Sequence, residues 1–496
     1  MADTSRMQAQ WTETGIPRLD RVLGGGLLRG SLAMVIGAPG AGKTVMGMQM
    51  AFHCAAQGKT TLFLTGYSET HDKLLSHTRG LSFFKPELVG DKIHFASLLD
   101  LLREGADDTE DAIVATARSQ QASLVVIDGF RGMRRLLADD QSVAHFLYSL
   151  GAKLSLLGAT TLLVVEGDPG EAARYPEITV CDVILTLRRE HRASRQRRLL
   201  EVMKARGSSP LEGVHPYTIT QDGLTVFPRF ESTLTAASRP EWESERAAFG
   251  IERLDAMLGG GLTAGTATLV AGSPGAGKTS LGLHLADQGA RLGEPTLFLG
   301  FMESAAQLRE QARTFGLDLA AAAAGGLARL LVLPGYDMEA DYLAGLLAED
   351  IELRGTRRLV IDSAAELERA IGDQERNPGF LSALVGYLRE HRVTSYFTLD
   401  IPTIAGPSLE FAETPLSVVA ENMLLLRKVE YRAQLHRVFS VLKMRFSDHE
   451  RAIYEYTITP GQGLQITDPA PLGEGLLTGM ARPLVDIPIQ SEPGGR

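Results

Sequence analysis

The 496-residue chain has only two cysteines, Cys54 and Cys181, and only two tryptophans. Two thiols cannot form a disulfide framework or a cysteine-based zinc site. Both lie in apolar or helical surroundings, so we expect buried thiols and a reducing, cytoplasmic location. No run of about 18 apolar residues is present, and the first ten residues lack the basic-then-apolar order of a signal peptide. We therefore expect no association with a membrane.

The chain also has no excess of positive charge. Its 50 Lys and Arg residues face 60 Asp and Glu residues, which gives a formal net charge of −10. This balance argues against a large electrostatic footprint for nucleic acid. One local exception is the arginine-rich segment 188–198, RREHRASRQRR. It is either a loop that contacts nucleic acid or the solvated tip of a hairpin between two apolar strands. The second repeat described below has the same strand–turn–strand order with far fewer charges, which favours the hairpin.

Two distant segments of the chain repeat one sequence. Residues 15–44 align with residues 250–279 without a gap, and 19 of the 30 aligned positions are identical. Each segment predicts a short helix, a glycine turn and a buried apolar strand. Further along, TLFLTGYSET matches TLFLGFMES, and SLVVIDG matches RLVIDS. The chain is therefore an internal duplication.

Each repeat contains a G-x-x-x-x-G-K-T string. In such a string the glycine-rich turn points backbone N–H groups at phosphate oxygens, the Lys reaches the β- and γ-phosphates, and the Thr hydroxyl holds Mg²⁺. The helix that follows adds its N-terminal dipole. We predict that both strings bind ATP with Mg²⁺. Their residues are Gly37, Ala38, Pro39, Gly40, Ala41, Gly42, Lys43 and Thr44, and Gly272, Ser273, Pro274, Gly275, Ala276, Gly277, Lys278 and Thr279.

An aspartate, Asp128 or Asp362, ends a later apolar strand in each repeat. A carboxylate at the carboxyl end of such a strand can hold the Mg²⁺ shell, whereas a lone buried Asp is often only a helix cap. Because each Asp follows a phosphate loop, we predict that it binds the metal together with Thr44 or Thr279.

Hydrolysis of ATP also needs a group that orients or deprotonates water. Glu69 in GYSET and Glu303 in FMES follow the second apolar strand of their repeats and are the predicted catalytic residues. The alternative is a surface carboxylate that opens a helix and is stabilised by the helix dipole.

A lysine and an arginine two residues apart end a late strand in each repeat. The pairs are Lys204 with Arg206, and Lys443 with Arg445. Residues two apart on a strand share a face. Positive charge is needed where negative charge develops on the γ-phosphate, often from a neighbouring subunit. The recurrence in both repeats favours this nucleotide role over solvated charge.

The apolar runs are short and do not alternate, which indicates strands buried on both faces of a parallel sheet. Helical stretches such as 44–57 and 280–291 separate them. We predict a doubly wound α/β fold, present twice. The predicted boundaries are 13–228 for the first domain, 229–247 for a polar linker and 248–465 for the second domain. Residues 466–496, rich in Pro and Gly, are expected to form a poorly ordered tail.

With these motifs the sequence resembles the circadian clock protein KaiC and its relatives. The resemblance covers about residues 13–465 and is especially close in LKMRFSDHERAIYEYTI. It implies two tandem RecA-like P-loop domains, each a mostly parallel sheet flanked by helices. It also implies a double-ring homohexamer with ATP between adjacent subunits, where the two Lys–Arg pairs act in trans. In that family the first unit is usually a slow ATPase, and the second can phosphorylate its own Ser and Thr side chains.

The sequence departs from the family pattern at two places. KaiC has two adjacent glutamates before the helix, and the first is considered the catalytic base; here the pairs read Ser68–Glu69 and Met302–Glu303. The Ser–Thr pair that KaiC phosphorylates corresponds to Ser417 and Val418. A two-site phosphorylation cycle is therefore not expected, and autophosphorylation at Ser417 alone is a hypothesis. The variant with Ser before Glu is more similar to the clock-independent KaiC-like ATPases of bacteria, and no clock partner is identified.

Three functions follow from the sequence. The first is a KaiC-like, ATP-hydrolysing homohexamer with a signalling or regulatory role. The second is a RecA-class ATPase that acts on DNA, which the acidic balance disfavours and which salt-dependent binding to single-stranded DNA would reveal. The third is a scaffold in which unhydrolysed ATP holds subunits together. The absence of the first glutamate from both pairs is consistent with this function.

Overall fold

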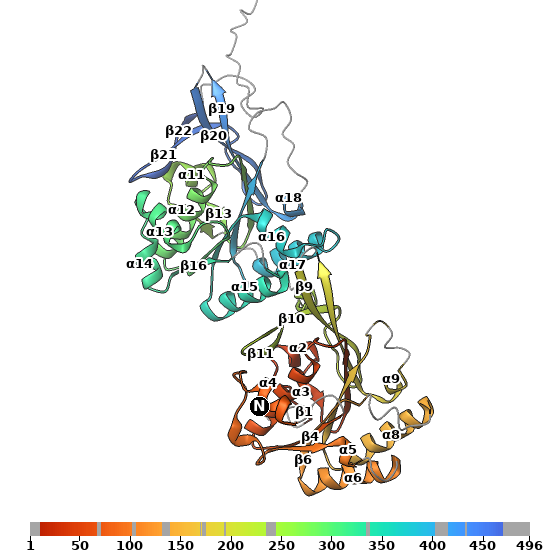
Figure 1. Ribbon diagram of the computed structural model, residues 1–496. Coiled ribbons are helices and arrows are strands. Elements are labelled where there is room, and N and C mark those ends of the chain that lie inside the picture. The colour runs from red at the N-terminus through yellow and green to blue at the C-terminus, as the bar shows by residue number, and fades with distance from the viewer. Residues whose placement is uncertain are drawn as a thin grey trace, which may run out of the picture. The chain divides into compact units, whose positions relative to one another are not determined.

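The chain forms two compact units, Met1–Thr233 and Leu234–Arg496 (Figure 1). The computed structural model describes residues 10–66, 71–101, 106–130, 139–168, 170, 175–192, 195–234, 245–333, 338–401, 415–431 and 434–469. Each unit is described below by itself.

The first unit alternates strands and helices before it ends in antiparallel strands. Its elements are β1 (Trp11–Thr12), α2 (Leu19–Val22), β2 (Leu27–Leu28), β3 (Leu32–Gly37), α3 (Lys43–Ala56), β4 (Thr60–Thr65), α4 (His71–Thr78), η1 (Pro86–Leu88), β5 (Ile93–Ser97), α5 (Leu98–Leu101), α6 (Ala106–Ser119), β6 (Ala122–Asp128), α8 (Asp140–Leu156), β7 (Thr160–Glu166), α9 (Glu177–Val180), β8 (Val183–Arg192), β9 (Arg195–Ala205), β10 (Val214–Thr220), β11 (Gly223–Val226) and α10 (Phe230–Thr233).

A nine-stranded sheet organises this unit, with the order β11-β10-β9-β8-β3-β7-β6-β4-β5. Every pairing from β8 to β5 is parallel. The pairings β8–β9, β9–β10 and β10–β11 are antiparallel. The phosphate-loop strand β3 therefore lies inside the parallel part, between β7 and β8.

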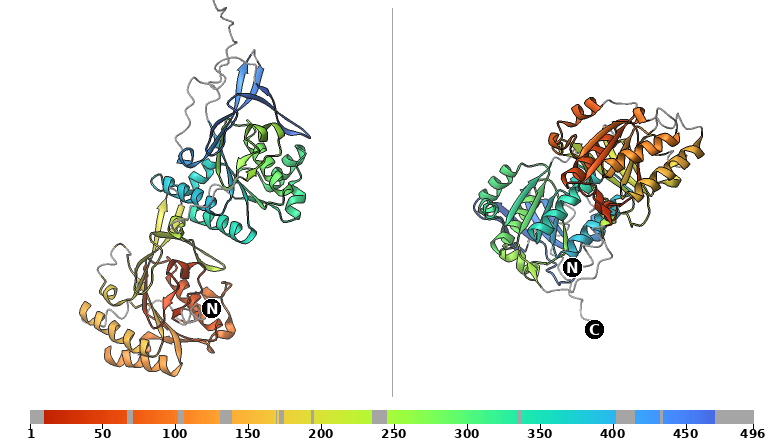
Figure 2. Two further views of the ribbon diagram at one scale, coloured as in Figure 1. Left: turned by 180° about the vertical axis from the view of Figure 1, so that it is seen from behind. Right: turned by 90° about the horizontal axis from the view of Figure 1, so that it is seen from below.

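Both faces of the sheet are covered, which explains why its strands are apolar without alternation. Along β3, Ala33 and Val35 belong to a core cluster that includes α3, while Met34 and Ile36 belong to a second cluster that includes α8. Views from behind and from below show helices on both sides of the sheet (Figure 2). At about 25 cal/mol per Å² of apolar surface, burial on two faces is the main stabilising term of such a fold.

The second unit repeats this plan. Its elements are β12 (Arg246–Ala247), α11 (Glu252–Met257), β13 (Leu262–Thr263), β14 (Ala267–Gly272), α12 (Lys278–Arg291), β15 (Thr296–Gly300), α13 (Ala305–Thr314), α14 (Leu319–Ala324), β16 (Ala328–Val332), α15 (Ala340–Arg354), β17 (Arg358–Asp362), α16 (Ala364–Ile371), α17 (Asn377–Glu390), β18 (Thr394–Asp400), α18 (Pro415–Val419), β19 (Asn422–Tyr431), β20 (Gln434–Met444), β21 (Tyr454–Thr459) and β22 (Gly463–Pro469).

The sheet order of the second unit is β16-β15-β17-β18-β14-β19-β20-β21-β22. Element for element this is the order of the first unit, with β14 in the place of β3. The structure thus confirms the predicted fold: two tandem RecA-like α/β domains, each with a mostly parallel sheet flanked by helices.

The predicted boundaries need correction at three places. The first unit begins before residue 13, because β1 pairs with β2. The predicted linker 229–247 is structured at both ends: Phe230 in α10 is buried, and β12 pairs with β13. The second unit continues past residue 465, because β22 runs to Pro469 and pairs with β21. The rest of the predicted tail, 470–496, lies outside the described residues.

The arginine-rich segment is part of a β-hairpin, as the favoured interpretation predicted. Strands β8 and β9 pair antiparallel from Val183 and Ala205 out to Arg192 and Arg195. Within the hairpin, Arg188 forms an ion pair at 3.0 Å with Glu201. Among the described residues, no helix is long and apolar enough to cross a membrane.

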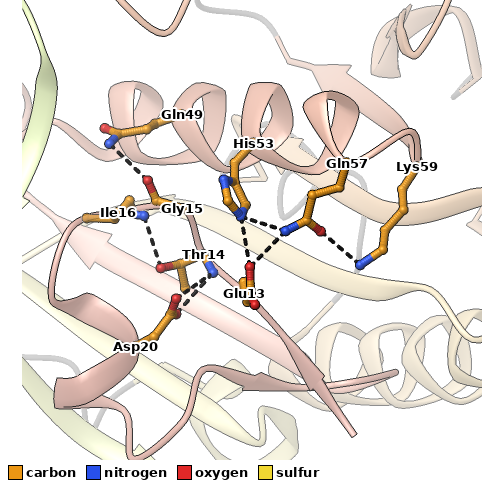
Figure 3. Close-up of polar contacts among 9 residues, drawn as sticks. All are labelled: Glu13, Thr14, Gly15, Ile16, Asp20, Gln49, His53, Gln57 and Lys59. Atoms are coloured by element: carbon orange, nitrogen blue, oxygen red, sulfur yellow. Dashed lines mark hydrogen bonds and ion pairs between the residues drawn. The ribbon is translucent and has the colours of Figure 1, made fainter. Parts of the chain in front are cut away.

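A polar network fastens the segment before α2 to the phosphate-loop helix α3 (Figure 3). The Glu13 carboxylate contacts His53 at 3.3 Å and accepts a hydrogen bond from Gln57 at 2.8 Å. Gln49 donates to the Gly15 carbonyl at 3.4 Å. Gln49 and His53 lie on α3 and Gln57 is its C-cap, so the network ties the segment before α2 to this helix. Asp20 closes the turn by accepting the backbone N–H of Thr14 at 3.0 Å.

Candidate nucleotide site

The phosphate loop of each unit connects a central strand to a long helix, β3 to α3 and β14 to α12. The residue before each helix is a glycine in the left-handed region, Gly42 with φ 96° and Gly277 with φ 100°. A side chain would be strained there, and its Cβ would also collide with Ile219 or Ile458 of the antiparallel strands. The backbone can therefore turn tightly enough for its N–H groups to face one point.

The lysine of each loop is buried and held by carbonyl oxygens of its own loop. Lys43 donates to two of them at 2.9 and 3.0 Å, and Lys278 does so at 2.9 and 3.2 Å. Lys278 also forms an ion pair at 2.7 Å with Asp400. Burial lowers the pKa of Lys43, while the charges of Glu166 and Asp128 act to raise it. Both ammonium groups lie where a bound phosphate would replace carbonyl oxygens as the acceptor.

The predicted metal-binding residues meet in both units. Thr44 Oγ1 donates to Asp128 Oδ2 at 2.8 Å, and Thr279 Oγ1 donates to Asp362 Oδ2 at 2.6 Å. The second oxygen of Asp362 accepts the hydroxyl of Thr398 at 2.5 Å. The carboxylates therefore face the phosphate loop, the geometry that the metal-binding prediction requires.

These residues fit magnesium bound together with a nucleotide. Mg²⁺ is usually held by one or two protein oxygens and completes its shell with water and substrate phosphates. A Thr–Asp pair is then a sufficient donor set. Within the described part of the chain, no group of three or more His, Cys, Asp or Glu forms a metal cluster.

Comparison with known proteins agrees with the two equivalent sites. The family model of the KaiC ATPase matches residues 12–231 and again residues 247–470. The chain belongs to the KaiC family of ATPases. The "Circadian clock oscillator protein KaiC" of Picosynechococcus sp. is 29% identical over 478 residues, which cover 92% of this chain and 90% of the relative. "Circadian clock oscillator protein KaiC 1" of Synechocystis sp. is 28% identical over 478 residues, 92% of this chain and 89% of the relative. The relative from Prochlorococcus marinus subsp. pastoris is 29% identical over 476 residues, 93% and 92% of the two chains.

Of the two predicted catalytic glutamates in this KaiC-family chain, one lies within the described residues. Glu69 lies outside them. Glu303 is half-buried and precedes Ser304, the N-cap of α13, which forms a capping box with Gln307. Glu303 therefore lies at the N-terminal end of α13, a position compatible both with the predicted catalytic role and with a carboxylate that opens the helix.

The predicted trans-acting pair of the first unit lies at the end of β9. Lys204 Nζ donates to the Ile178 and Thr179 carbonyls at 2.9 and 3.4 Å. Arg206, just past the strand, donates to the same Thr179 carbonyl at 3.5 Å and forms an ion pair with Asp182 at 3.5 Å. Both side chains thus reach the end of the short helix α9, as expected for residues on one face.

In the second unit, Lys443 Nζ donates to the Ala420 carbonyl at 2.7 Å, just after α18. Burial lowers the pKa of Lys443, and the nearby charge of Arg445 lowers it further. The predicted phosphorylation residue Ser417 lies on α18 and is half-buried. Lys443 therefore contacts the end of the helix that carries Ser417, a proximity that spacing along the sequence did not reveal.

A tyrosine that supports each phosphate loop was missed by the sequence analysis. Tyr217 on β10 donates its hydroxyl to the Ala41 carbonyl at 2.5 Å, and Tyr456 on β21 donates to the Ala276 carbonyl. Both tyrosines are buried, and burial raises the pKa of Tyr217 to about 12. The YTIT motif, which follows the Lys–Arg pair in both repeats, is the signal that could have found them.

A cation beside each loop was also missed. Arg189 on β8 donates to the Pro39 carbonyl at 3.3 Å, and Lys428 on β19 donates to the Pro274 carbonyl at 3.2 Å. One residue of the arginine-rich segment therefore contacts the nucleotide site of its own unit.

Proposed function

We propose that this KaiC-family protein binds Mg²⁺ and ATP at two sites per chain, hydrolyses ATP, and assembles as a homohexamer with a regulatory role. The observation that carries the proposal is the complete phosphate-binding constellation in both units. Each has a left-handed glycine turn, a buried lysine and a Thr–Asp pair at 2.8 or 2.6 Å. Bound Mg²⁺ would neutralise charge on the phosphates, and Thr44, Asp128, Thr279 and Asp362 would hold it.

The Lys–Arg pairs support the homohexamer as the active form. Lys204 and Arg206 share an acceptor and lie at the end of β9 that pairs with the start of β8, whereas the Thr–Asp pair lies at the opposite, phosphate-loop end of β3. A cation is needed opposite the γ-phosphate, and an adjacent subunit can supply it. In this arrangement Lys204, Arg206, Lys443 and Arg445 complete the site of the neighbouring subunit. A cytoplasmic location is part of the proposal, and the two buried free thiols support it.

For the second unit we propose autophosphorylation at Ser417. Transfer to a hydroxyl and transfer to water need the same phosphate loop and metal shell, and differ in the nucleophile. Ser417 is half-buried on α18, three residues before Ala420, whose carbonyl accepts from Lys443, and this supports a nucleophile on the same segment that a cation contacts.

Partition of γ-labelled phosphate tests the proposal. The purified full chain is incubated with Mg²⁺ and γ-labelled ATP, beside Lys43→Ala and Lys278→Ala, and label is measured as free phosphate and as protein-bound phosphate. Free phosphate that falls in one or both variants supports an ATPase and identifies the active unit. Protein-bound label that disappears in Lys278→Ala and in Ser417→Ala supports the kinase.

Other outcomes contradict parts of the proposal. Label that persists in Ser417→Ala excludes this residue as the acceptor. Intact ATP after long incubation makes the nucleotide a structural ligand and removes the ATPase. Light scattering with and without ATP tests the homohexamer directly, and a mass that stays at one chain overturns it.

A further inference from the structure

A carboxylate ends the strand beside the phosphate-loop strand in both units. In the parallel pairing of β3 with β7, Glu166 lies opposite Gly37, and in the pairing of β14 with β18, Asp400 lies opposite Gly272. The residue after each acid donates its backbone N–H to that same glycine carbonyl, at 3.2 and 3.1 Å. The sheet thus fixes an acid at the first residue of each phosphate loop.

The acid of the second unit contacts the lysine that is expected to bind phosphate. Asp400 Oδ1 lies 2.7 Å from Lys278 Nζ, and the Asp400 side chain is 52% exposed while that of Lys278 is 8% exposed. A phosphate-loop lysine binds β- and γ-phosphate oxygens. The carboxylate therefore lies about one further hydrogen-bond length from those oxygens. In the first unit, burial lowers the pKa of Lys43, and the charge of Glu166 is the larger of the two charge effects that raise it.

Glu303, predicted from the sequence, is the alternative base of this unit. Met302, at the position of the family's first glutamate, has no acceptor for a proton and is 79% exposed. Asp362 already accepts two threonine hydroxyls. Among the described residues of this unit, Asp400 is the carboxylate in contact with the phosphate-binding lysine. When Lys278 turns to the phosphates, an Asp400 oxygen becomes available to a water beside the γ-phosphate.

We propose that Asp400, and Glu166 in the first unit, accept the proton of the attacking water. The inference rests on the ATPase function proposed above and assigns its general base. The water oxygen forms a bond to the γ-phosphorus while the bond to the β,γ-bridging oxygen breaks, and ADP leaves with that electron pair. One water proton passes to the carboxylate and from there to solvent, so ATP and water give ADP, inorganic phosphate and a proton.

Two substitutions at one position separate a base from a residue that only positions the lysine. The full chain carries Lys43→Ala to silence the first unit, and Asp400→Asn and Asp400→Ala are added to it. Asn can still accept a hydrogen bond from Lys278 but cannot take a proton, whereas Ala can do neither. Because a general base contributes about 10²–10⁴-fold, we expect both variants to lose about 100-fold or more in kcat. Nucleotide affinity in Asp400→Asn should be unchanged or tighter, because a negative charge beside the phosphates is removed.

Matched measurements keep each outcome informative. Glu375→Gln, which neutralises an exposed carboxylate of the same unit, should retain the kcat of the Lys43→Ala parent. Nucleotide titration confirms that every variant is folded, and the fall of kcat toward low pH should flatten in Asp400→Asn.

A parental kcat in Asp400→Asn overturns the proposal. If Asp400→Ala is slow in that case, the carboxylate only positions Lys278. If the parent binds ATP without turnover, the ATPase proposal for this unit fails and this inference with it. Glu166→Gln and Glu166→Ala in a Lys278→Ala chain repeat the test in the first unit.

Discussion

At the scale of single residues, the duplication places different side chains in equivalent surroundings. Gln49 on α3 accepts the backbone N–H of Leu224 at 2.8 Å, and His284 on α12 accepts that of Leu464 at 3.1 Å. The histidine accepts the same kind of backbone hydrogen bond as the glutamine, but its side chain is titratable. Burial lowers the pKa of His284 to about 4.

This difference predicts acid sensitivity in the second unit. In the unfolded chain His284 titrates near 6.5. Between pH 6.5 and 4 the unfolded chain binds more protons than the folded unit, so stability falls as the pH falls through this window. From pH 7 to 5 we expect the loss to be about 2 kcal/mol. Hydrogen-exchange protection factors of α12 and β22 amides at the two pH values measure it. His284→Gln should remove this loss, and an equal loss in that variant would contradict the assignment to His284.

A second residue-scale difference concerns the turn after each Lys–Arg pair. Gly207 has φ 73°, and Phe446, its counterpart, has φ 71° and is 56% exposed. A bulky residue in the left-handed region costs about 1–2 kcal/mol. Phe446→Gly is therefore expected to stabilise the second unit by about 1 kcal/mol, measured as a higher midpoint in calorimetry. In contrast, Gly207→Ala should destabilise the first unit, because a side chain is strained at a φ of 73°. A lower midpoint for Phe446→Gly would mean that contacts of the Phe ring outweigh the backbone strain.

At the scale of elements, the antiparallel strands support the phosphate loops from the side. Tyr456 on β21 is buried, and its hydroxyl is a donor to the loop carbonyl of Ala276. Tyr456→Phe leaves that carbonyl without this donor, at a cost of about 1 kcal/mol or more. We expect Mg²⁺–ATP to bind the second unit about fivefold more weakly, measured by titration in a Lys43→Ala chain. Tyr217→Phe in the same chain is the control and should leave this affinity unchanged. Equal affinities in Tyr456→Phe and its parent would show that the hydroxyl does not order the loop.

The sequence predicted the elements that depend on local pattern and missed those that depend on strand order. The loops, the Thr–Asp pairs and the buried parallel strands follow from motif and apolar runs, and the structure has them. The role of Glu166 could not be inferred, because TLLVVEG reads only as a strand until β7 is known to lie beside β3. Arg358 was missed for a similar reason. It is fully buried at the start of β17, where its Nε contacts Glu294 at 2.5 Å, a pairing across 64 residues of sequence.

At the scale of the whole molecule, the duplication gives two nucleotide sites per chain, and hexamer formation would place each site between two copies. Such an interface would be heterologous: one copy would contribute its phosphate loop, and the next would contribute its Lys–Arg pair. A subunit without the loop lysine can then still supply the cations. A subunit without the arginine can still bind the nucleotide.

This division of labour predicts complementation between two inactive variants. In a Lys278→Ala chain, which isolates the first unit, Lys43→Ala removes nucleotide binding and Arg206→Ala removes the trans cation. Each variant alone should be inactive. After the two are mixed and reassembled, random pairing gives about a quarter of the interfaces an intact loop and an intact cation, so about a quarter of the parental turnover should return. Released phosphate is measured as the mixing ratio is varied, with a maximum expected at equal amounts. If no activity returns at any ratio although light scattering shows mixed hexamers, Arg206 acts within its own subunit and the interfacial site is wrong.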